Sequence, residues 1–315
     1  MVNSNQGDIL NRIIKNDHLA ISRAITLVES GDDINDKLFS GIYPHTHNTI
    51  KLGITGPPGA GKSTLTDQLI RLYLNQNKSV GVIAVDPSSP FSGGALLGDR
   101  VRMNNYLWND NVFIRSMGSK GNLGGLNKKA QEAGDILAAS GKDIVIYETV
   151  GVGQGEHDIA KAADLTIVLL VPESGDDIQL MKAGLIEIAD LFVVNKSDRN
   201  GSEKLVQSIY SVLHIFKNKD NFEPPVFKVS ADRGDGVEDL FNGIGNFLNN
   251  KDHELYLENK KISRYKDRVF NIIQNRLIDS FWTNSNIEKL ELTINDLKIS
   301  ESSPYQIAEK LLNTK

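Results

Sequence analysis

A glycine-rich segment is the clearest candidate for chemistry in this sequence. It reads GPPGAGKS from Gly56 to Ser63 and fits the pattern GxxxxGK[ST]. Glycines let consecutive backbone N–H groups turn inward around phosphate oxygens, and a helix that starts there directs its positive end at the same place. Lys62 can reach the β- and γ-phosphates, and the Ser63 hydroxyl can complete the coordination of Mg²⁺. The segment predicts a nucleoside triphosphate site formed by Gly56, Pro58, Gly59, Ala60, Gly61, Lys62, Ser63 and Thr64.

A second motif, NKSD from Asn195 to Asp198, predicts which base is bound. A carboxylate such as that of Asp198 can accept hydrogen bonds from guanine N1–H and the 2-amino group, a donor pair that adenine lacks. Asn195 would hold the loop, Lys196 would lie over the base, and a backbone N–H at Ser230 and Ala231 would meet guanine O6. A polar loop without function is the alternative. Because the motif follows a β-branched run downstream of the phosphate loop, we expect GTP and GDP as ligands.

Acidic residues follow two other β-branched runs. Glu148 begins ETVG, which resembles the DxxG element of GTPases with Glu in place of Asp, and Gly151 could offer its N–H to the γ-phosphate. Asp86 precedes PSSP and could bind Mg²⁺ or the attacking water. An acid at this position is typical of the branch that contains signal-recognition, metal-insertion and cell-division-site nucleotidases. The alternative for Asp86, and equally for Asp99, is a cap on a helix or turn.

The elements that must position these residues alternate between strands and helices. The β-branched runs lie at 50–55, 80–85, 112–115, 143–147, 165–171, 191–195 and 225–229. Such runs separated by helical stretches predict an α/β fold with a doubly wound, mostly parallel sheet, in which the loops at the carboxyl ends of the strands carry the site. Helical periodicity before and after the sheet predicts three parts: a helical extension over 1–45, a P-loop domain over 46–250 and a helical arm over 251–315.

Composition excludes several classes of protein. The 315-residue chain has a net charge of −5 and no cysteine, so it carries no basic footprint for nucleic acid or an anionic membrane, no disulfide and no thiolate metal site. Its longest apolar run, LTIVLLV at 165–171, is too short to span a bilayer. The first twenty residues have no continuous apolar stretch, so we expect no signal or transit peptide.

Several long motifs occur together and in order: AVDPSSP, GGALLGDRVRM, ETVGVGQ, PESGDDIQLMKAG and NKSD. Together they resemble the methylmalonyl-CoA mutase-associated GTPases, whose older name was lysine/arginine/ornithine transport kinases. The resemblance covers nearly the whole chain, including SRAITLVES at 22–30 and the helix expected to start at Ser303-Pro304. The stretch DDIQLMKAG departs from the sequence more frequent in the family, and this leaves the partner open.

The resemblance implies a fold of the SIMIBI class and a function. Members are cytoplasmic or mitochondrial homodimers, joined by their C-terminal arms. They bind an adenosylcobalamin-dependent acyl-CoA mutase, gate its cofactor loading and help remove inactivated cofactor. For this chain we expect a cytoplasmic homodimer, with no nucleic acid or membrane as partner. The resemblance also implies that Ser63, Asp86, Asp99 and Glu148 surround Mg²⁺ and that Asp176, Gln179 and Lys182 belong to a switch that signals to the mutase. For the switch segment, an ordinary helix-start loop is the alternative.

Slow hydrolysis of GTP is the expected activity. Lys62, the metal and loop N–H groups would stabilise the leaving diphosphate. Val152 stands where a water-orienting Gln would follow DxxG, which leaves Asp86, Asp99 and Gln154 as candidates, alongside Lys62 and Glu148 at the reaction centre. The alternatives are a metal-insertion GTPase, a small-molecule kinase or a scaffold that never hydrolyses GTP.

Overall fold

The β-branched runs of the sequence form one sheet in the computed structural model, which describes residues 3–30, 36–86, 106, 108–118, 123–149, 155–174, 184–215, 223–296 and 303–313. The strands are β1 (Ile50–Thr55), β2 (Val80–Asp86), β3 (Val112–Gly118), β4 (Ile144–Thr149), β5 (Leu165–Leu170), β6 (Leu191–Val194) and β7 (Val226–Lys228). Their order in the seven-stranded sheet is β3-β2-β4-β1-β5-β6-β7, and all neighbouring strands are parallel. The predicted α/β fold is confirmed.

Three strands are longer at their carboxyl ends than the sequence predicts. β4 continues through Glu148 and Thr149, where the prediction ended it at Tyr147. The extension is paired, because Glu148 lies opposite Ala84 of β2 and Thr149 opposite Val85. β2 and β3 are also paired up to their last residues, with Asp86 of β2 opposite Gly118 of β3. Pairing with a neighbouring strand, which no local pattern reveals, sets these ends.

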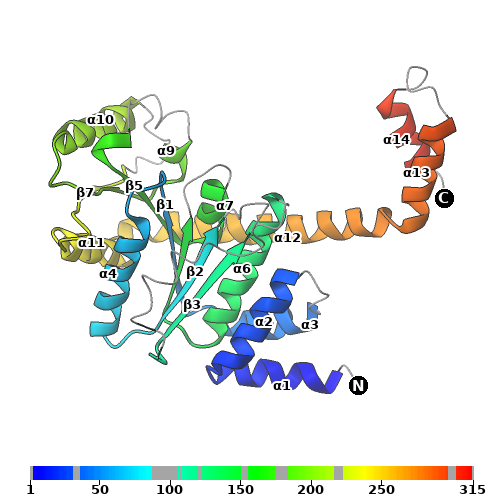
Figure 1. Ribbon diagram of the computed structural model, residues 1–315, viewed down its shortest axis with the longest axis horizontal. Helices are drawn as coiled ribbons and strands as arrows, with labels where there is room; N and C mark the ends of the chain where they lie inside the picture. Colours follow the sequence, from blue (N-terminus) through cyan, green and yellow to red (C-terminus); the bar gives the residue numbers. More distant parts are fainter. Residues whose placement is uncertain are drawn as a thin grey trace. The chain divides into compact units, whose positions relative to one another are not determined.

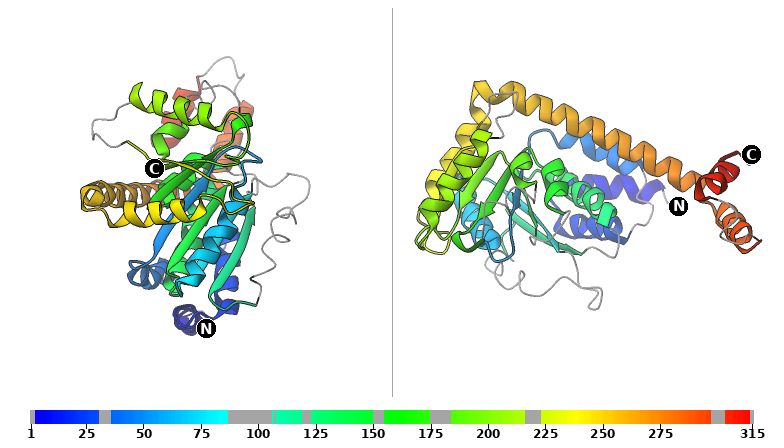
Figure 2. Two further views of the ribbon diagram at one scale, coloured as in Figure 1. Left: turned by 90° about the vertical axis from the view of Figure 1, so that its left-hand side faces the viewer. Right: turned by 90° about the horizontal axis from the view of Figure 1, so that it is seen from above.

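Helices cover both faces of the sheet (Figures 1 and 2). On one face, α4 (Lys62–Asn75) and α11 (Val237–Asn249) share a hydrophobic core with strand residues such as Leu52 and Ile146. The other face is covered by α6 (Leu123–Ala139), α7 (Gly155–Ala162), α9 (Leu185–Ile188) and α10 (Ser202–Ile215). A 3₁₀ turn, η3 (Pro172–Ser174), follows β5. Apolar strands buried on both faces are what a parallel sheet requires.

The N-terminal helices add a further layer outside α6. They are α1 (Asn3–Ile14), α2 (His18–Ser30) and α3 (Asp36–Ile42), followed by the 3₁₀ turn η1 (Tyr43–His45). Ile21 and Ile25 are fully buried in the core that also contains Leu137 of α6. The Arg115 guanidinium of β3 is paired with the carboxylate of Glu29, which fixes the end of α2 to the edge of the sheet.

The C-terminal helices are α12 (Glu254–Phe281), preceded by the 3₁₀ turn η4 (Lys251–His253), then α13 (Asn284–Asp296) and α14 (Pro304–Asn313). α14 begins where Ser303-Pro304 predicts: the backbone N–H of Gln306 donates to Ser303 Oγ (3.3 Å), and the Ser303 N–H donates to Gln306 Oε1 (2.9 Å). This reciprocal pair is a capping box.

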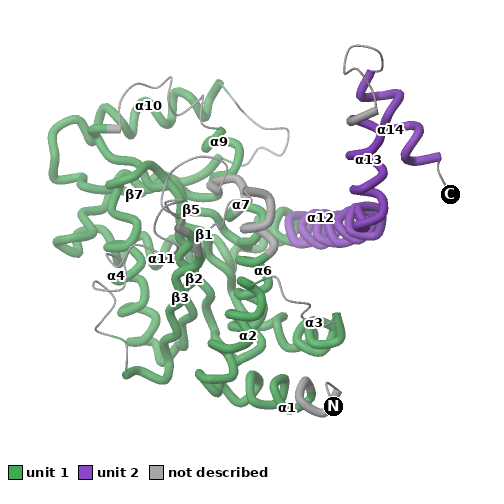
Figure 3. The backbone as a smooth tube through the Cα atoms, turned by 45° about the vertical axis from the view of Figure 1, so that its right-hand side comes forward, with its two compact units in different colours: residues 1–257 green, residues 258–315 purple. Residues whose placement is uncertain are grey.

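Two compact units divide the chain, residues 1–257 and 258–315 (Figure 3). The first unit contains the N-terminal helices together with the sheet. The predicted division at 45/46 and 250/251 stays a prediction. None of the helices in the described part of the chain combines the length and the apolar character needed to cross a lipid bilayer.

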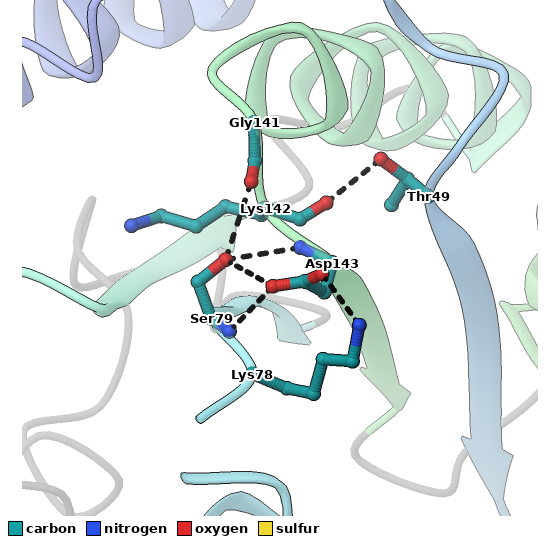
Figure 4. A network of polar contacts seen from close by, with 6 residues as sticks. All are labelled: Thr49, Lys78, Ser79, Gly141, Lys142 and Asp143. Atoms are coloured by element: carbon teal, nitrogen blue, oxygen red, sulfur yellow. Dashed lines mark hydrogen bonds and ion pairs between the residues drawn. The ribbon is translucent and has the colours of Figure 1, made fainter. Parts of the chain in front are cut away.

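A polar network ties the beginnings of β1, β2 and β4 together (Figure 4). The Ser79 N–H donates to Asp143 Oδ2 (2.8 Å), and the Ser79 hydroxyl contacts the same carboxylate oxygen (2.9 Å). The Thr49 hydroxyl donates to the carbonyl oxygen of Lys142 (2.8 Å). Burial raises the pKa of Asp143, but the Ser79 N–H and the Lys78 ammonium outweigh it, so that the pKa lies below its usual range. The amino-terminal edge of the sheet is therefore fixed by polar contacts, while the opposite edge carries the candidate site.

Candidate nucleotide-binding site

The predicted phosphate and guanine motifs both lie at the carboxyl edge of the sheet. β1 runs into the GPPGAGKS loop, β6 runs into Asn195, and the turn at Ser230 and Ala231 follows β7. Because all neighbouring strands are parallel, these ends meet at one edge, the usual place for ligands in open α/β sheets.

Two glycines of the phosphate loop have both a positive φ and no space for a side chain. Gly56 has φ +139° and Gly61 has φ +89°, both in the region that side chains disfavour. A Cβ atom on Gly56 would lie 2.1 Å from the carbonyl oxygen of Leu169, and one on Gly61 would lie 2.3 Å from Asn195 Nδ2. The loop therefore passes against β5 and against the guanine motif with no room for a side chain.

Lys62 begins α4 and is nearly buried, with 6% of its surface exposed. Its ammonium donates to the carbonyl oxygens of Gly56 (2.8 Å) and Pro57 (2.9 Å). These bonds hold the charge against the loop that would surround a phosphate group. A cation in a largely buried site attracts phosphate oxygens more strongly than a cation in water does.

Ser63, Thr66 and Glu148 converge where α4 meets β4. The Ser63 hydroxyl donates to Glu148 Oε1 (2.5 Å), and the Thr66 hydroxyl lies 3.0 Å from Glu148 Oε2. Glu148 is 4% exposed and Thr66 is fully buried. A buried carboxylate is stable only when its oxygens are hydrogen-bonded, and here two hydroxyl groups from one helix supply those bonds.

Asn195 joins the phosphate loop to the turn after β7. Its Nδ2 donates to the carbonyl oxygen of Ala60 (2.7 Å), and its Oδ1 accepts from the N–H of Ala231 (3.0 Å). Its own N–H donates to the carbonyl oxygen of Leu170 at the end of β5 (2.8 Å). With 3% of its surface exposed, the side chain acts as an internal brace that fixes the spacing between the two motifs.

Asp198 presents an ionised carboxylate. The Ser230 hydroxyl donates to Oδ1 (2.8 Å), and the Arg233 guanidinium lies 2.9 Å from Oδ2. The Ser230 hydrogen bond is the largest of the contacts that hold the pKa of Asp198 below its usual range. A carboxylate that stays charged is acceptor-only, as recognition of the two guanine donors requires.

Both amides predicted to meet guanine O6 donate within the protein. The Ser230 N–H donates to the carbonyl oxygen of Asp235 (2.9 Å), and the Ala231 N–H donates to Asn195 Oδ1 (3.0 Å). A direct bond from Ala231 to guanine O6 therefore requires that Asn195 share or release this hydrogen. Lys196, expected over the base, has φ +54°, a left-handed conformation that a non-glycine residue adopts only when its surroundings hold it.

Several predicted site residues lie outside the described part of the chain: Asp99, Gly151, Gln154, Asp176, Gln179 and Lys182. Of Asp86 the structure describes the backbone, which ends β2 opposite Gly118 of β3. Pro58 and Thr64 lie in the loop and the first turn of α4, as the motif requires.

The described oxygen donors, the Ser63 hydroxyl and the Glu148 carboxylate, are of the type that binds Mg²⁺. A serine hydroxyl in contact with a glutamate carboxylate offers the oxygen ligands that Mg²⁺ prefers. Among the described side chains there is no group of three or more His, Cys, Asp or Glu that could hold a metal. The two aspartates of the predicted set, Asp86 and Asp99, have no described side chains.

Sequence reasoning missed Thr66 and Arg233. Thr66 follows Ser63 by three residues, so helical spacing would have placed both hydroxyls on one face of α4. For Arg233 no local signal exists, because its contact with Asp198 depends on the turn after β7.

Comparisons with known proteins identify the relatives of this chain. The profile of the family "Methylmalonyl Co-A mutase-associated GTPase MeaB" matches residues 21–286. The GTPase ArgK of Escherichia coli is 40% identical over 246 residues, covering 76% of this chain and 74% of its own. A mouse protein named "Methylmalonic aciduria type A homolog, mitochondrial" is 32% identical, covering 95% of this chain and 77% of its own. The crystal structure of an LAO/AO transport system kinase superposes with a TM-score of 0.71 at 27% identity, covering 98% of this chain and 97% of its own.

Proposed function

Because the chain belongs to the MeaB family of methylmalonyl-CoA mutase-associated GTPases, we propose that it is a GTP-hydrolysing chaperone of an adenosylcobalamin-dependent acyl-CoA mutase. In this role it gates loading of the cofactor and protects or reactivates the mutase. Membership of the family makes the chain a GTPase and a guanine-nucleotide binder. The mutase, the dimer and the metal are the parts that we propose.

The family match supports the mutase as partner, and the structural observation that supports the nucleotide site is the brace formed by Asn195. It bonds both to Ala60 in the phosphate loop and to Ala231 in the turn beside Asp198. A guanine nucleotide that lies along this brace places its phosphates over Lys62 and its base edge on Asp198. The full phosphate set is the loop from Gly56 to Thr64, with Gly151 at the γ-phosphate.

The chain's own groups supply mainly position and charge during hydrolysis. Lys62 and the loop amides neutralise the charge that develops on the leaving diphosphate. Ser63 and Glu148, with Asp86 and Asp99, would hold Mg²⁺, which when bound supplies further neutralisation of the phosphate oxygens. Asp86, Asp99 or Gln154 would orient the attacking water. We infer that turnover is slow until a mutase contacts the proposed switch residues Asp176, Gln179 and Lys182.

A homodimer formed through the C-terminal arm and a cytoplasmic location complete the proposal. α12 supports the arm as a contact surface, because none of its residues is buried in the single chain although apolar side chains recur along it. Cell fractionation tests the location.

Turnover of GTP, measured with and without a purified adenosylcobalamin-dependent acyl-CoA mutase, tests the function. We expect slow release of phosphate from the protein alone and faster release with the mutase. Rapid turnover alone that no mutase changes would contradict the chaperone role. Phosphate transferred to a small molecule would favour the kinase alternative, and acceleration by the precursor of a metalloenzyme would favour the metal-insertion alternative.

A further inference from the structure

Thr66 carries a hydroxyl group at a fully buried position of α4, where an aliphatic side chain would be the usual choice. The buried stripe of α4 also contains Leu65 and Leu69, and Thr66 is as completely buried as they are. A hydroxyl group that is removed from water without partners is costly, so its partners indicate why it is there.

The Thr66 hydroxyl has two acceptors at equal distance. Its Oγ1 lies 3.0 Å from the carbonyl oxygen of Lys62, one turn earlier in α4, and 3.0 Å from Glu148 Oε2. A hydroxyl group has one proton to donate, and a charged carboxylate is a stronger acceptor than a peptide carbonyl. An ionised Glu148 therefore draws this proton away from the helix backbone.

The second oxygen of Glu148 has a separate donor. Glu148 Oε1 accepts from Ser63 (2.5 Å), and Ser63 precedes Thr66 by three residues on the same helix. Each hydroxyl group contacts a different carboxylate oxygen, so the plane of the carboxylate is fixed relative to α4.

Glutamate needs this restraint more than aspartate does. The ETVG segment has Glu148 where the DxxG pattern has aspartate, and glutamate has one more rotatable bond before its carboxylate. A longer side chain reaches α4 but gains rotamers that would turn its oxygens away from Ser63. One anchored oxygen removes that freedom.

We propose that Thr66 is a positioning residue, which anchors Glu148 Oε2 so that Oε1 stays beside Ser63, and that this anchor sets the affinity of the site for Mg²⁺. The inference rests on the magnesium role of Ser63 and Glu148 in the proposed function. Thr66 touches neither nucleotide nor metal and acts through Glu148.

Release of a fluorescent GDP analogue from the full chain, followed over a range of Mg²⁺ concentrations and also in EDTA, tests the proposal. Thr66→Val keeps the shape of the side chain and removes the hydroxyl group. We expect it to raise the Mg²⁺ concentration for half-maximal retention of the nucleotide about tenfold, as loss of a partner that orients a metal ligand usually does. Its release rate in EDTA should equal that of the unaltered chain, because the phosphate loop and guanine motif are untouched.

Thr66→Ser retains the hydroxyl group and should restore Mg²⁺ dependence close to that of the unaltered chain. If Thr66→Val does not fold, Thr66→Ala removes the same hydroxyl group with less bulk and is expected to show the same shift. The proposal is overturned if the hydroxyl-free variants keep the original Mg²⁺ dependence, if Thr66→Ser shifts as far as Thr66→Val, or if the change persists in EDTA. If the unaltered chain retains nucleotide equally with and without Mg²⁺, the metal role of Glu148 fails and the role of Thr66 fails with it. GTP turnover with a mutase tests the chaperone function separately.

Discussion

Asp198 can decide the base because both of its carboxylate oxygens accept hydrogen bonds. Asp198→Asn replaces one acceptor by an amide donor, which opposes the 2-amino group of guanine but matches the 2-oxo group of xanthine. We expect the affinity for GTP to fall on the order of a hundredfold and xanthosine triphosphate to become the better ligand. Titration of the unaltered chain and of Asp198→Asn with GTP and with xanthosine triphosphate measures the change in affinity.

Asp232→Asn is the matched control for this substitution. Asp232 Oδ1 also lies within reach of the Ser230 hydroxyl (3.0 Å), yet we give it no contact with the base. It should keep its preference for GTP. A similar loss of GTP binding in both variants would mean that the loop, rather than the carboxylate of Asp198, recognises guanine.

Lys142 gives the second prediction at this scale, because it is a lysine with 2% of its surface exposed. Its ammonium donates to the carbonyl oxygen of Asp110 (2.9 Å), and its side chain extends away from the Ser79–Asp143 network (Figure 4). Burial is the main cause that lowers the pKa of Lys142 from 10.5 to about 8. Between pH 8 and 10.5 the unfolded chain therefore holds a proton that the folded chain has released.

The free energy of unfolding should consequently rise with pH over that window, relative to a chain without this amine. Lys142→Met supplies the reference, since it keeps the stem and does not titrate. We expect the stability of the unaltered chain minus that of the variant to increase by up to about 3 kcal/mol between pH 8 and 10.5. Urea unfolding of both chains at several pH values measures it. Parallel stability curves would contradict the predicted shift in pKa.

At the scale of elements, the phosphate loop packs directly against Asn195 of the guanine motif, and the spacing between the two motifs depends on this contact. Gly59 and Gly61 both have positive φ, but a Cβ atom on Gly59 meets nothing within 4 Å, whereas one on Gly61 would lie 2.3 Å from Asn195 Nδ2. Gly59→Ala should cost about 1–2 kcal/mol of stability through backbone strain. Gly61→Ala should cost about 1–3 kcal/mol more, because it displaces the Asn195 amide from Ala60. Thermal or urea unfolding of the two variants compares these costs, and equal losses would show that the brace does not depend on this contact.

A hydrogen bond from Tyr256 ties the start of α12 to the sheet. The Tyr256 hydroxyl donates to Asp190 Oδ1 (2.6 Å), and Asp190 is fully buried at the beginning of β6. Tyr256→Phe removes a donor from a buried carboxylate and should lower the free energy of unfolding by about 1–3 kcal/mol. Tyr210→Phe on the surface of α10 is the control and should change it by less than about 0.5 kcal/mol. Equal effects in urea unfolding would assign no special role to the Tyr256 contact.

The sequence predicts elements and contiguous motifs better than it predicts contacts. β-Branched runs located each of the seven strands in the described sheet, and the phosphate and guanine motifs are each read from a few consecutive residues. The Thr66–Glu148 contact joins residues 82 positions apart, and the Asn195–Ala60 contact joins residues 135 apart. Such contacts depend on strand order and side-chain direction, which propensity does not encode. Lys142 is a similar case, because a Gly-Lys-Asp turn gives no sign that its lysine is buried.

At the scale of the whole molecule, the C-terminal unit needs a partner for its apolar surface. Ile262, Tyr265, Val269, Ile273 and Leu277 recur every three or four residues along α12, and each has at least 40% of its surface exposed. The 28-residue helix is about 42 Å long, enough for a paired interface along its length. A second copy of the chain is the partner that we propose.

Charges placed in this stripe should separate the copies. Ile273→Glu combined with Leu277→Glu puts two carboxylates into a surface that would become buried on pairing, so we expect light scattering to give the mass of a monomer where the unaltered chain gives a dimer. Asn275→Glu adds a charge on the opposite side of α12 by helical spacing and should leave the dimer intact. GTP affinity should be the same in all three chains, since the nucleotide site lies within residues 1–257. A doubly substituted chain that remains dimeric would place the interface elsewhere, and a monomeric unaltered chain would remove the proposed dimer altogether.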